Sequence, residues 1–310
     1  MVYSRIKSTG GYLPDKVLTN KDLEKIVETS DEWIRDRTGI SERHIAENQT
    51  ATDLAEHALR SALEAASMEA SALELIIVAT CTQESSFPST AARLQKRFNV
   101  KGFAAFDVNA ACSGFIYGIA IADAMIRSGQ VKTAAVIGAE KMSSIVDWTD
   151  RETCVLFGDG AGAIILEAAA EQGVISTHIH ADGSYEDLLY HEPVCNVIKM
   201  KGNEVFRVAV RTLERIVDET LEANNMTKED VDWLIPHQAN MRIMSATAKK
   251  LNLPADRMVV TVDKHGNTSA ASIPLALNHA VRAGSIKRGE VLLMEAFGGG
   301  FTWGSALVRY

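Results

Sequence analysis

Three side chains in this sequence are suited to nucleophilic chemistry, and each follows an apolar run. Cys112 lies in "NAACSGF", His237 in "IPHQAN" and Asn267 in "HGNTSAAS". A cysteine at a turn from strand into helix lies near the free N–H groups of that helix, which favour the thiolate and lower its pKa. The alternative for Cys112 is an inert core position, because free cysteines are among the most buried residues.

The histidine and the asparagine offer donors that complement a nucleophile. His237 follows Pro236 at a strand end and is suited to act as a base, as a hydrogen-bond donor or as a packing residue. Gly266 permits a tight turn before Asn267, whose carboxamide can donate to an oxyanion. His265 is the competing candidate in the same turn, and we interpret it as structural.

Two glycine-rich stretches need separate interpretations. "AFGGGFTWGSALV" places glycines at 298, 299, 300 and 304 between apolar runs, where backbone N–H groups can face an oxyanion or where a flexible hairpin can form. "FGDGAGAIIL" resembles a nucleotide-binding loop, but its glycines lead into a strand instead of following one into a helix. This order excludes the dinucleotide-binding fingerprint.

The elements that position these residues repeat along the chain. Strand-like apolar runs end at Thr80, Asn109 and Glu140, and three more end at Gln238, Lys264 and Phe297. A single offset of 156 residues aligns Val78 with Leu234, Phe106 with Val262 and Val136 with Leu292. The chain therefore reads as an internal duplication, which we divide into 1–168 and 169–310.

Helical patterns lie between the strand-like runs. Thr52–Met68 and Glu204–Asn224 have apolar residues at three- and four-residue spacing, and Ser113–Met125 is apolar nearly all round. This alternation predicts an α/β fold with a largely parallel sheet in each half and the central helices packed together between the two sheets. Ligands bind beyond the carboxyl ends of parallel strands, so Cys112 and the turn that holds Asn267 are expected to face one cavity.

Composition narrows the function classes. The 310 residues are 46% apolar and carry a net charge of −8, which argues against general affinity for nucleic acid or for an anionic membrane. Four widely spaced cysteines and the isolated pair His178 and His180 predict neither a disulfide nor a metal site. The start "MVYSRIKSTGGYLP" has no apolar signal core, and the longest apolar run, Phe115–Ile126, is too short to span a bilayer, so we expect a cytoplasmic protein.

Taken together, the four motifs around Cys112, His237, Asn267 and the glycine-rich stretch resemble the thiolase superfamily, and most closely the β-ketoacyl-acyl carrier protein synthase III family. The resemblance covers essentially the whole chain and implies a five-layered αβαβα fold. It implies a decarboxylative condensation of an acyl-CoA primer, expected to be acetyl-CoA, with malonyl-acyl carrier protein. Cys112 would carry the acyl group, His237 and Asn267 would stabilise the enolate, and the N–H groups of Cys112 and Gly304 would form the oxyanion hole.

The resemblance also implies binding residues. Coenzyme A would bind as part of the substrate thioester and not as a resident cofactor. It would contact Thr29, Trp33, Arg37, Arg151, Asn203 and Asn240. The alternative for Trp33 is a packing role, which is common for a tryptophan on an amphipathic helix. Phe87 in "SSFPST" would reach across a homodimer into the partner's acyl pocket.

A basic face would receive the acidic carrier protein despite the net negative charge. Arg242, Lys249 and Lys250 in "NMRIMSATAKK" would form it, with Arg207 and Arg211 adjacent. The simpler reading of such charges is a solvated helix face.

Other functions fit some of the same residues. A Cys-His-Asn thioester hydrolase would use water as the acceptor and His237 as the base. A condensing enzyme of secondary metabolism would keep the reaction but change the product, and a non-catalytic acyl-CoA-binding homologue would not need all three polar residues. The segment Tyr190–Met200 is shorter than in enterobacterial relatives, which bears on acyl-chain length.

Overall fold

The apolar runs of the sequence form the central strands of two sheets. The computed structural model describes residues 1–310. Its strands are β1 (Tyr3–Tyr12), β2 (Val17–Thr19), β3 (Glu42–His44), β4 (Leu75–Ala79), β5 (Ala104–Val108), β6 (Thr133–Lys141), β7 (Asp159–Ala169), β8 (Val174–Ala181), β9 (Leu189–Glu192), β10 (Val197–Met200), β11 (Trp233–Pro236), β12 (Val291–Gly298) and β13 (Thr302–Arg309). All residues of β4, "LIIVA", are buried, as expected for a strand covered on both faces.

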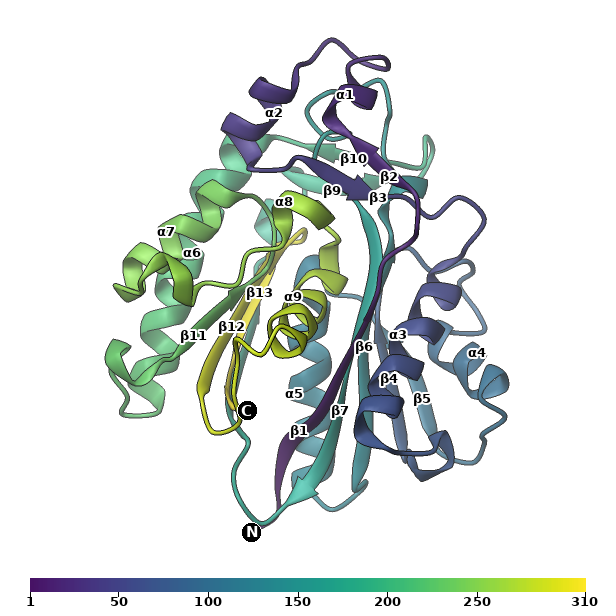
Figure 1. Cartoon of the computed structure of the whole chain (residues 1–310), viewed down its shortest axis with the longest axis vertical. Helices are drawn as coiled ribbons and strands as arrows, with labels where there is room; N and C mark the ends of the chain where they lie inside the picture. Colours follow the sequence, from purple (N-terminus) through teal and green to yellow (C-terminus); the bar gives the residue numbers. More distant parts are fainter.

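The helices cover these sheets. They are α1 (Asn20–Leu23), α2 (Asp31–Thr38), α3 (Ala51–Ala66), α4 (Thr90–Arg97), α5 (Gly114–Arg127), α6 (Gly202–Ala223), α7 (Met241–Leu251), α8 (Val262–His265) and α9 (Ser272–Arg282). Figure 1 shows five layers side by side: α3 with α4, the first sheet, α5 with α9, the second sheet, and α6 with α7. The predicted α/β sandwich and the three helices expected from periodicity are confirmed.

The two sheets share one topology. The first has the order β1-β7-β6-β4-β5, and the second has the order β8-β13-β12-β11 when it is listed in the same direction. The antiparallel pairs β1–β7 and β7–β6 of the first sheet correspond to β8–β13 and β13–β12 of the second. The parallel pair β6–β4 corresponds to β12–β11. The duplication is therefore confirmed, but the sheets are mixed and not largely parallel. The proposed division after residue 168 falls near the end of β7.

One predicted strand is wrong. The run Met258–Lys264 was expected to match β5, yet it contributes only an isolated bridge between Leu234 and Met258 before the chain turns into α8. The second sheet is one full strand narrower for this reason. The β-branched composition of "MVVTVDK" favours a strand locally, but the chain must turn here to bring Asn267 back toward the first sheet.

The middle layer joins the halves. α5 packs against strands of both sheets, and α9 packs against β1 and β7 of the first sheet and β11 of the second. Contact between the two helices is concentrated at the 3₁₀ turns that precede them, η2 (Ala111–Ser113) and η7 (Ser269–Ala271). A Cβ at Gly138 would lie 2.2 Å from the carbonyl oxygen of Ala270, so glycine permits this close approach.

The glycines of "FGDGAGAIIL" also serve packing. They lead into β7, as predicted, and a Cβ at Gly162 would lie 2.5 Å from the backbone nitrogen of Leu275 in α9. Their role is close helix–sheet contact and not phosphate binding. None of the helices in the structure combines the length and apolarity that crossing a membrane requires.

Candidate active site

A cavity of about 1260 Å³ brings the three chemically suited residues together. Cys112, His237 and Asn267 all line it. They come from η2 after β5, from the chain after β11, and from the turn between α8 and η7. The expectation that these residues face one cavity is therefore confirmed, although Asn267 follows a short helix and not the expected strand.

The two turns hold unusual backbone. Ala111, directly before Cys112, has φ 46°, and Ser269 has φ 50°, so each turn has a non-glycine residue in the left-handed region. The N–H of Ser269 donates to Oδ1 of Asn267 at 2.9 Å, which fixes this turn. A Cβ at Gly298 would lie 2.7 Å from the nitrogen of Cys112, so the end of β12 packs directly against the nucleophile turn.

The Cys112 thiol is less acidic than its turn suggested. Only 9% of the residue is exposed, and burial raises its pKa to about 11, with a smaller contribution from the nearby Glu140. The nearby Ser269 hydroxyl opposes this rise in pKa. The ligand-free protein therefore holds a neutral thiol at pH 7. Its proton must leave if the sulfur acts as a nucleophile.

His237 is a neutral imidazole. Burial lowers its pKa to about 4. Its Nδ1 lies 2.6 Å from the Ser272 hydroxyl, which accepts a hydrogen bond from the N–H of Gln238. That arrangement leaves the hydroxyl proton free to donate to Nδ1, so we assign the ring proton to Nε2.

Asn267 is oriented in a similar way. Because its Oδ1 accepts from the Ser269 N–H, its Nδ2 retains both protons for other partners. His265, the competing candidate, is held edge-on near His44 and His279 and does not line the cavity, and burial lowers its pKa to about 4. This placement agrees with its structural interpretation.

The expectation for Gly304 is wrong. This residue lies inside β13, in register with Ala296 of β12 on one side and Ile179 of β8 on the other, and it does not line the cavity. The glycine-rich stretch is not one loop, because β12 ends at Gly298 and β13 begins at Thr302. Gly299 and Gly300 form the turn between them and line the cavity.

Aromatic and basic residues line the cavity at α2 and at the segment before β7. Trp33 of α2 has the guanidinium of Arg37 at 4.5 Å and that of Arg151 at 5.0 Å from its ring centroid. Asn203 and Asn240 also line the cavity, as expected. Thr29 does not, and its hydroxyl is buried without a hydrogen bond.

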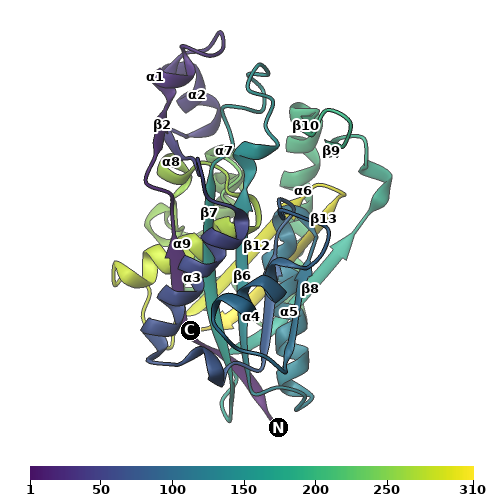
Figure 2. The ribbon, with the colours of Figure 1, turned by 90° about the vertical axis from the view of Figure 1, so that its right-hand side faces the viewer.

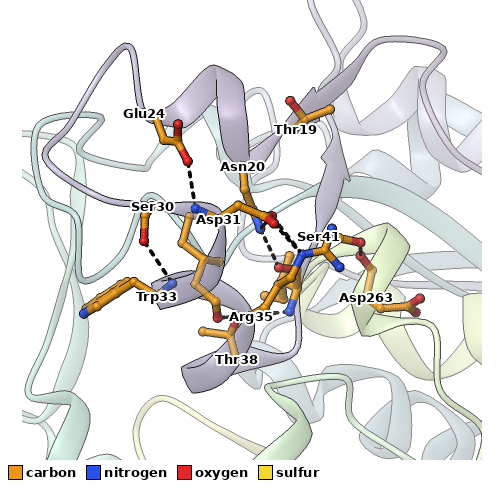
Figure 3. A network of polar contacts seen from close by, with 12 residues as sticks. Thr19, Asn20, Glu24, Ser30, Asp31, Trp33, Arg35, Thr38, Ser41 and Asp263 are labelled. Carbon is orange, nitrogen blue, oxygen red and sulfur yellow. Dashed lines mark hydrogen bonds and ion pairs between the residues drawn. The ribbon is translucent and has the colours of Figure 1, made fainter.

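A polar network holds α2 in place, as Figure 3 shows. Ser30 caps the helix by accepting from the Trp33 N–H at 3.1 Å, and Asn20 donates to the Asp31 carboxylate at 2.8 Å. Ser41 donates through its hydroxyl to the Asp263 carbonyl at 2.6 Å, which ties this region to α8. Figure 2 shows α2 and the β9–β10 hairpin at the same end of the sandwich. The segment Tyr190–Met200 forms most of this hairpin and contributes to the cavity lining.

Most of the basic residues predicted to receive the carrier protein are exposed. Arg207 and Arg211 on α6 and Arg242 and Lys249 on α7 are exposed, and the two helices pack together. Arg242 also lines the cavity. Lys250 instead forms an ion pair with Asp218 at 2.7 Å, which occupies its charge.

Sequence reasoning missed a buried acid and its neighbours. Glu140 is the second-last residue of β6. Its carboxylate accepts from the hydroxyls of Thr82 at 2.6 Å and Ser269 at 3.0 Å and from the N–H of Cys81 at 3.1 Å. Cys81 lines the same cavity as Cys112. The strand-end rule applied to "LIIVAT" and "TAAVIGAE" would have found Cys81 and Glu140.

Glu295 in β12 is a second buried acid and gives a prediction about stability. Neither carboxyl oxygen makes a hydrogen bond of normal geometry, and burial raises its pKa to about 8 against a weaker opposing contact with Thr247. The folded protein keeps this proton to higher pH than the unfolded chain does. Its contribution to stability is therefore full below the unfolded pKa of about 4.3 and is lost as pH rises toward 8.

We expect Glu295→Gln to remove this loss. Between pH 5 and pH 8 the free energy of unfolding of the wild type should fall relative to the variant by on the order of 3 kcal/mol. Urea denaturation of both proteins at the two pH values measures the difference. Equal pH slopes for the two proteins would mean that Glu295 is ionised or solvated in the folded state.

Comparison with known proteins identifies the family. Residues 106–183 match the family model for 3-oxoacyl-[acyl-carrier-protein (ACP)] synthase III, and residues 221–310 match the model for its C-terminal part. A β-ketoacyl-[acyl-carrier-protein] synthase III of Thioalkalivibrio sulfidiphilus is 61% identical over 100% of both chains.

Solved structures agree with this assignment. The 3-oxoacyl-[acyl-carrier-protein] synthase III of Aquifex aeolicus has a TM-score of 0.97 at 52% identity, with 99% of this chain and 100% of that chain covered. The enzyme of Pseudomonas aeruginosa has a TM-score of 0.96 at 39% identity, with 99% and 98% covered. The chain belongs to the β-ketoacyl-acyl carrier protein synthase III family of thiolase-fold condensing enzymes.

Proposed function

We propose that this acyltransferase starts fatty acid synthesis by joining an acyl-CoA primer, acetyl-CoA first among the candidates, to malonyl-acyl carrier protein with loss of carbon dioxide. One observation carries the proposal. A nucleophile, two neutral hydrogen-bond donors and a basic aromatic site line a single cavity.

In the first half-reaction, Cys112 attacks the thioester carbonyl of the primer. A bond forms between Sγ and the acyl carbon, the bond to the coenzyme A sulfur breaks, and coenzyme A leaves as a thiol. The N–H of Cys112 stabilises the oxyanion of this step, and the turn at Gly299 supplies the second donor in place of Gly304. Gly298, the residue before it, packs against the Cys112 nitrogen.

In the second half-reaction, malonyl-acyl carrier protein loses carbon dioxide. The Nε2–H of His237 and the Nδ2–H of Asn267 donate to the thioester carbonyl and stabilise the enolate. Neutral donors suit this task, because their protons stay in place while charge develops on the substrate oxygen. The carbanion then attacks the acyl-Cys112 carbonyl, forms the new C–C bond and expels the cysteine sulfur.

Coenzyme A binding requires a rearrangement at Trp33. Arg151 lies 5.0 Å from the ring centroid and donates to the Glu28 carbonyl at 3.0 Å, so it occupies one face of the indole. We propose that adenine enters between Trp33 and Arg151, with Arg37 on the phosphates and with Asn203 and Asn240 along the pantetheine. Thr29 is left out of this direct contact set.

The carrier protein is proposed to dock on α6 and α7 through Arg207, Arg211, Arg242 and Lys249. Arg242→Ala should raise KM for malonyl-acyl carrier protein by about tenfold at low salt, and less at high salt, because exposed charges mainly affect encounter and are screened. Lys250→Ala, whose charge already pairs with Asp218, is the matched control with a smaller effect. If Arg242→Ala raises KM equally for malonyl-pantetheine, its role is in the channel and not in docking.

A homodimer is proposed from the first sheet and from Phe87. β5 is the edge strand of that sheet, and Phe87 is 85% exposed. A free strand edge and a protruding aromatic side chain are typical of a surface that a second copy covers. The reaction as drawn uses no metal or resident cofactor, and we propose that it takes place in the cytoplasm.

Product analysis tests the proposed function. The purified enzyme is mixed with malonyl-acyl carrier protein and a panel of acetyl-, branched and longer acyl-CoA primers. We expect equal amounts of carbon dioxide, free coenzyme A and β-ketoacyl-acyl carrier protein, with acetyl-CoA preferred. Free fatty acid without a ketoacyl product would identify a hydrolase, and a product outside fatty acid synthesis would favour secondary metabolism.

A further inference from the structure

Arg43 in β3 is an arginine that the fold buries among uncharged acceptors. It is 0% exposed, and the three oxygens that accept its hydrogen bonds are all neutral. Burial lowers the pKa of the guanidinium to about 10, so it stays charged at pH 7. Its Nε is buried without a hydrogen-bond partner. A charge buried in this way costs stability, and neither half-reaction uses it directly.

The guanidinium joins two parts of the chain that lie far apart in the sequence. Nη1 donates to the Leu18 carbonyl at 3.1 Å and to Oδ1 of Asn20 at 2.9 Å, and Nη2 donates to the Val155 carbonyl at 2.8 Å. Asn20 is itself fixed, because its Nδ2 donates to Asp31 and to the Ile40 carbonyl, each at 2.8 Å. The planar fork of an arginine can reach both sides at once from this firm base.

Val155 belongs to a segment that needs such an anchor. Residues 145–158 contain no helix or named strand, and Val155 and Leu156 line the cavity. The N–H of Asn267 donates to the Leu156 carbonyl at 2.8 Å, and the Asn267 carbonyl accepts from the Gly158 N–H at 3.1 Å. The backbone of Asn267 is therefore fixed to the same short stretch that the guanidinium holds through Val155.

Arg43 also packs against this turn. A Cβ at Gly158 or at Gly266 would lie 3.0 Å from the Cβ of Arg43, so the side chain starts directly beside both backbone stretches. Ser41, two residues before it, donates from its N–H and its hydroxyl to the carbonyl of Asp263 in α8, and Figure 3 shows the two residues in contact. The chain at β3 therefore holds the Asn267 turn by packing and by hydrogen bonds.

We propose that Arg43 is a positioning residue that aims Asn267 at the malonyl thioester carbonyl, an inference that rests on the proposed function. Its hydrogen bond to Val155 fixes the stretch 155–158, this stretch fixes the Asn267 backbone, and the Nδ2–H donor is held where the enolate oxygen forms. An oxyanion donor must be in place before charge develops, and a misplacement of about 1 Å can lower the rate by about 100-fold. Cys112 lies on a different turn, η2, so acylation should be spared.

The test measures two half-reactions in Arg43→Met, whose side chain is apolar and has no donor. Acylation is followed by rapid quenching and intact mass at saturating acetyl-CoA. Condensation is followed as single-turnover transfer from preformed acyl-enzyme to malonyl-acyl carrier protein. Transfer should slow by about 10- to 100-fold, while acylation stays within about threefold of wild type.

Arg288→Met is the matched control. Arg288 also donates to two carbonyls, those of Ile6 and Lys7, but it does not line the cavity. Both half-reactions of this variant should therefore stay within about threefold of wild type, since exposed contacts remote from a site rarely affect it by more.

A double-variant cycle separates positioning from a general loss of structure. In the Asn267→Ala background, Arg43→Met should change transfer by less than about threefold, because the donor that Arg43 positions is already absent. A merely structural role would slow transfer by the same factor in both backgrounds. Arg43→Lys keeps the charge and a donor toward Val155, so it should recover part of the rate, and it is measured in both backgrounds in case Arg43→Met does not fold.

Three results would overturn the role of Arg43: transfer at the wild-type rate in both Arg43 variants, equal slowing in the two backgrounds, or equal slowing of acylation and transfer. The wild type tests the proposed function separately. A wild type that forms no acyl-enzyme or no ketoacyl product would overturn the proposed function, and the role of Arg43 with it.

Discussion

Cys112→Ala is expected to form no acyl-enzyme and to lower condensation by at least about 10⁴-fold, because removal of a covalent nucleophile eliminates the two-step path. The substitution removes one sulfur atom from a turn whose geometry is set by backbone contacts with Gly298 and η7, so the fold should persist. Mixing the variant with acetyl-CoA and recording intact mass measures the first effect. A discontinuous assay of the ketoacyl product measures the second.

Two other cysteines serve as controls. Cys195 is exposed in the β9–β10 hairpin, and Cys195→Ala should acylate like the wild type. Cys81 lines the cavity, but burial and the nearby Glu140 raise the pKa of its thiol well above the usual value. An adduct that persists in Cys112→Ala and disappears in Cys81→Ala would reassign the nucleophile.

His237→Ala and Asn267→Ala are expected to acylate normally but to slow condensation by about 10² to 10³-fold, the usual loss when one oxyanion donor is removed. The double variant should lose less than the product of the two single effects, because both donors act on one oxygen. Single-turnover transfer from preformed acyl-enzyme to malonyl-acyl carrier protein isolates this step. If either single variant condenses at the wild-type rate, its assigned role is wrong.

The pH dependence of this step follows from His237. Its pKa of about 4 keeps the imidazole neutral above that value, so condensation should show no histidine titration between pH 5.5 and 8. His237→Gln retains a neutral donor and should recover part of the lost rate. A bell-shaped profile centred near pH 6.5 would show that the imidazole is a proton-transfer group and not a fixed donor.

The sequence predicted the architecture because its patterns are strong and repeated. Buried strands such as β4 are continuous apolar runs, and one offset relates β4 and β6 to β11 and β12. The antiparallel strands β1 and β7 were less visible, since the glycines and polar residues of β1 and the small residues of β7 weaken the hydrophobic signal. Met258–Lys264 was misread because its local strand preference gives way to the turn that carries Asn267.

The candidate site was predictable where residue type and strand ends coincide. Cys112, His237 and Asn267 met both conditions and converge in the cavity. The oxyanion role that the resemblance implied for Gly304 was wrong, because the glycine-rich sequence does not show where β13 begins. The pairing of Gly304 with Ala296 places it inside that strand. The sequence also did not predict that the Cys112 thiol is neutral. Burial by the surrounding layers raises its pKa more than the helix start lowers it, and the extent of burial is visible only in the folded structure.

The measurement that tests the central claim most directly is intact mass of the enzyme with acetyl-CoA, repeated after addition of malonyl-acyl carrier protein. The account predicts one acetyl group per chain, located on Cys112 by peptide mapping and stable in water for minutes. Only the malonyl substrate should discharge it, with formation of acetoacetyl-acyl carrier protein. Discharge by water alone, or an acetyl group on any residue other than Cys112, would contradict the account.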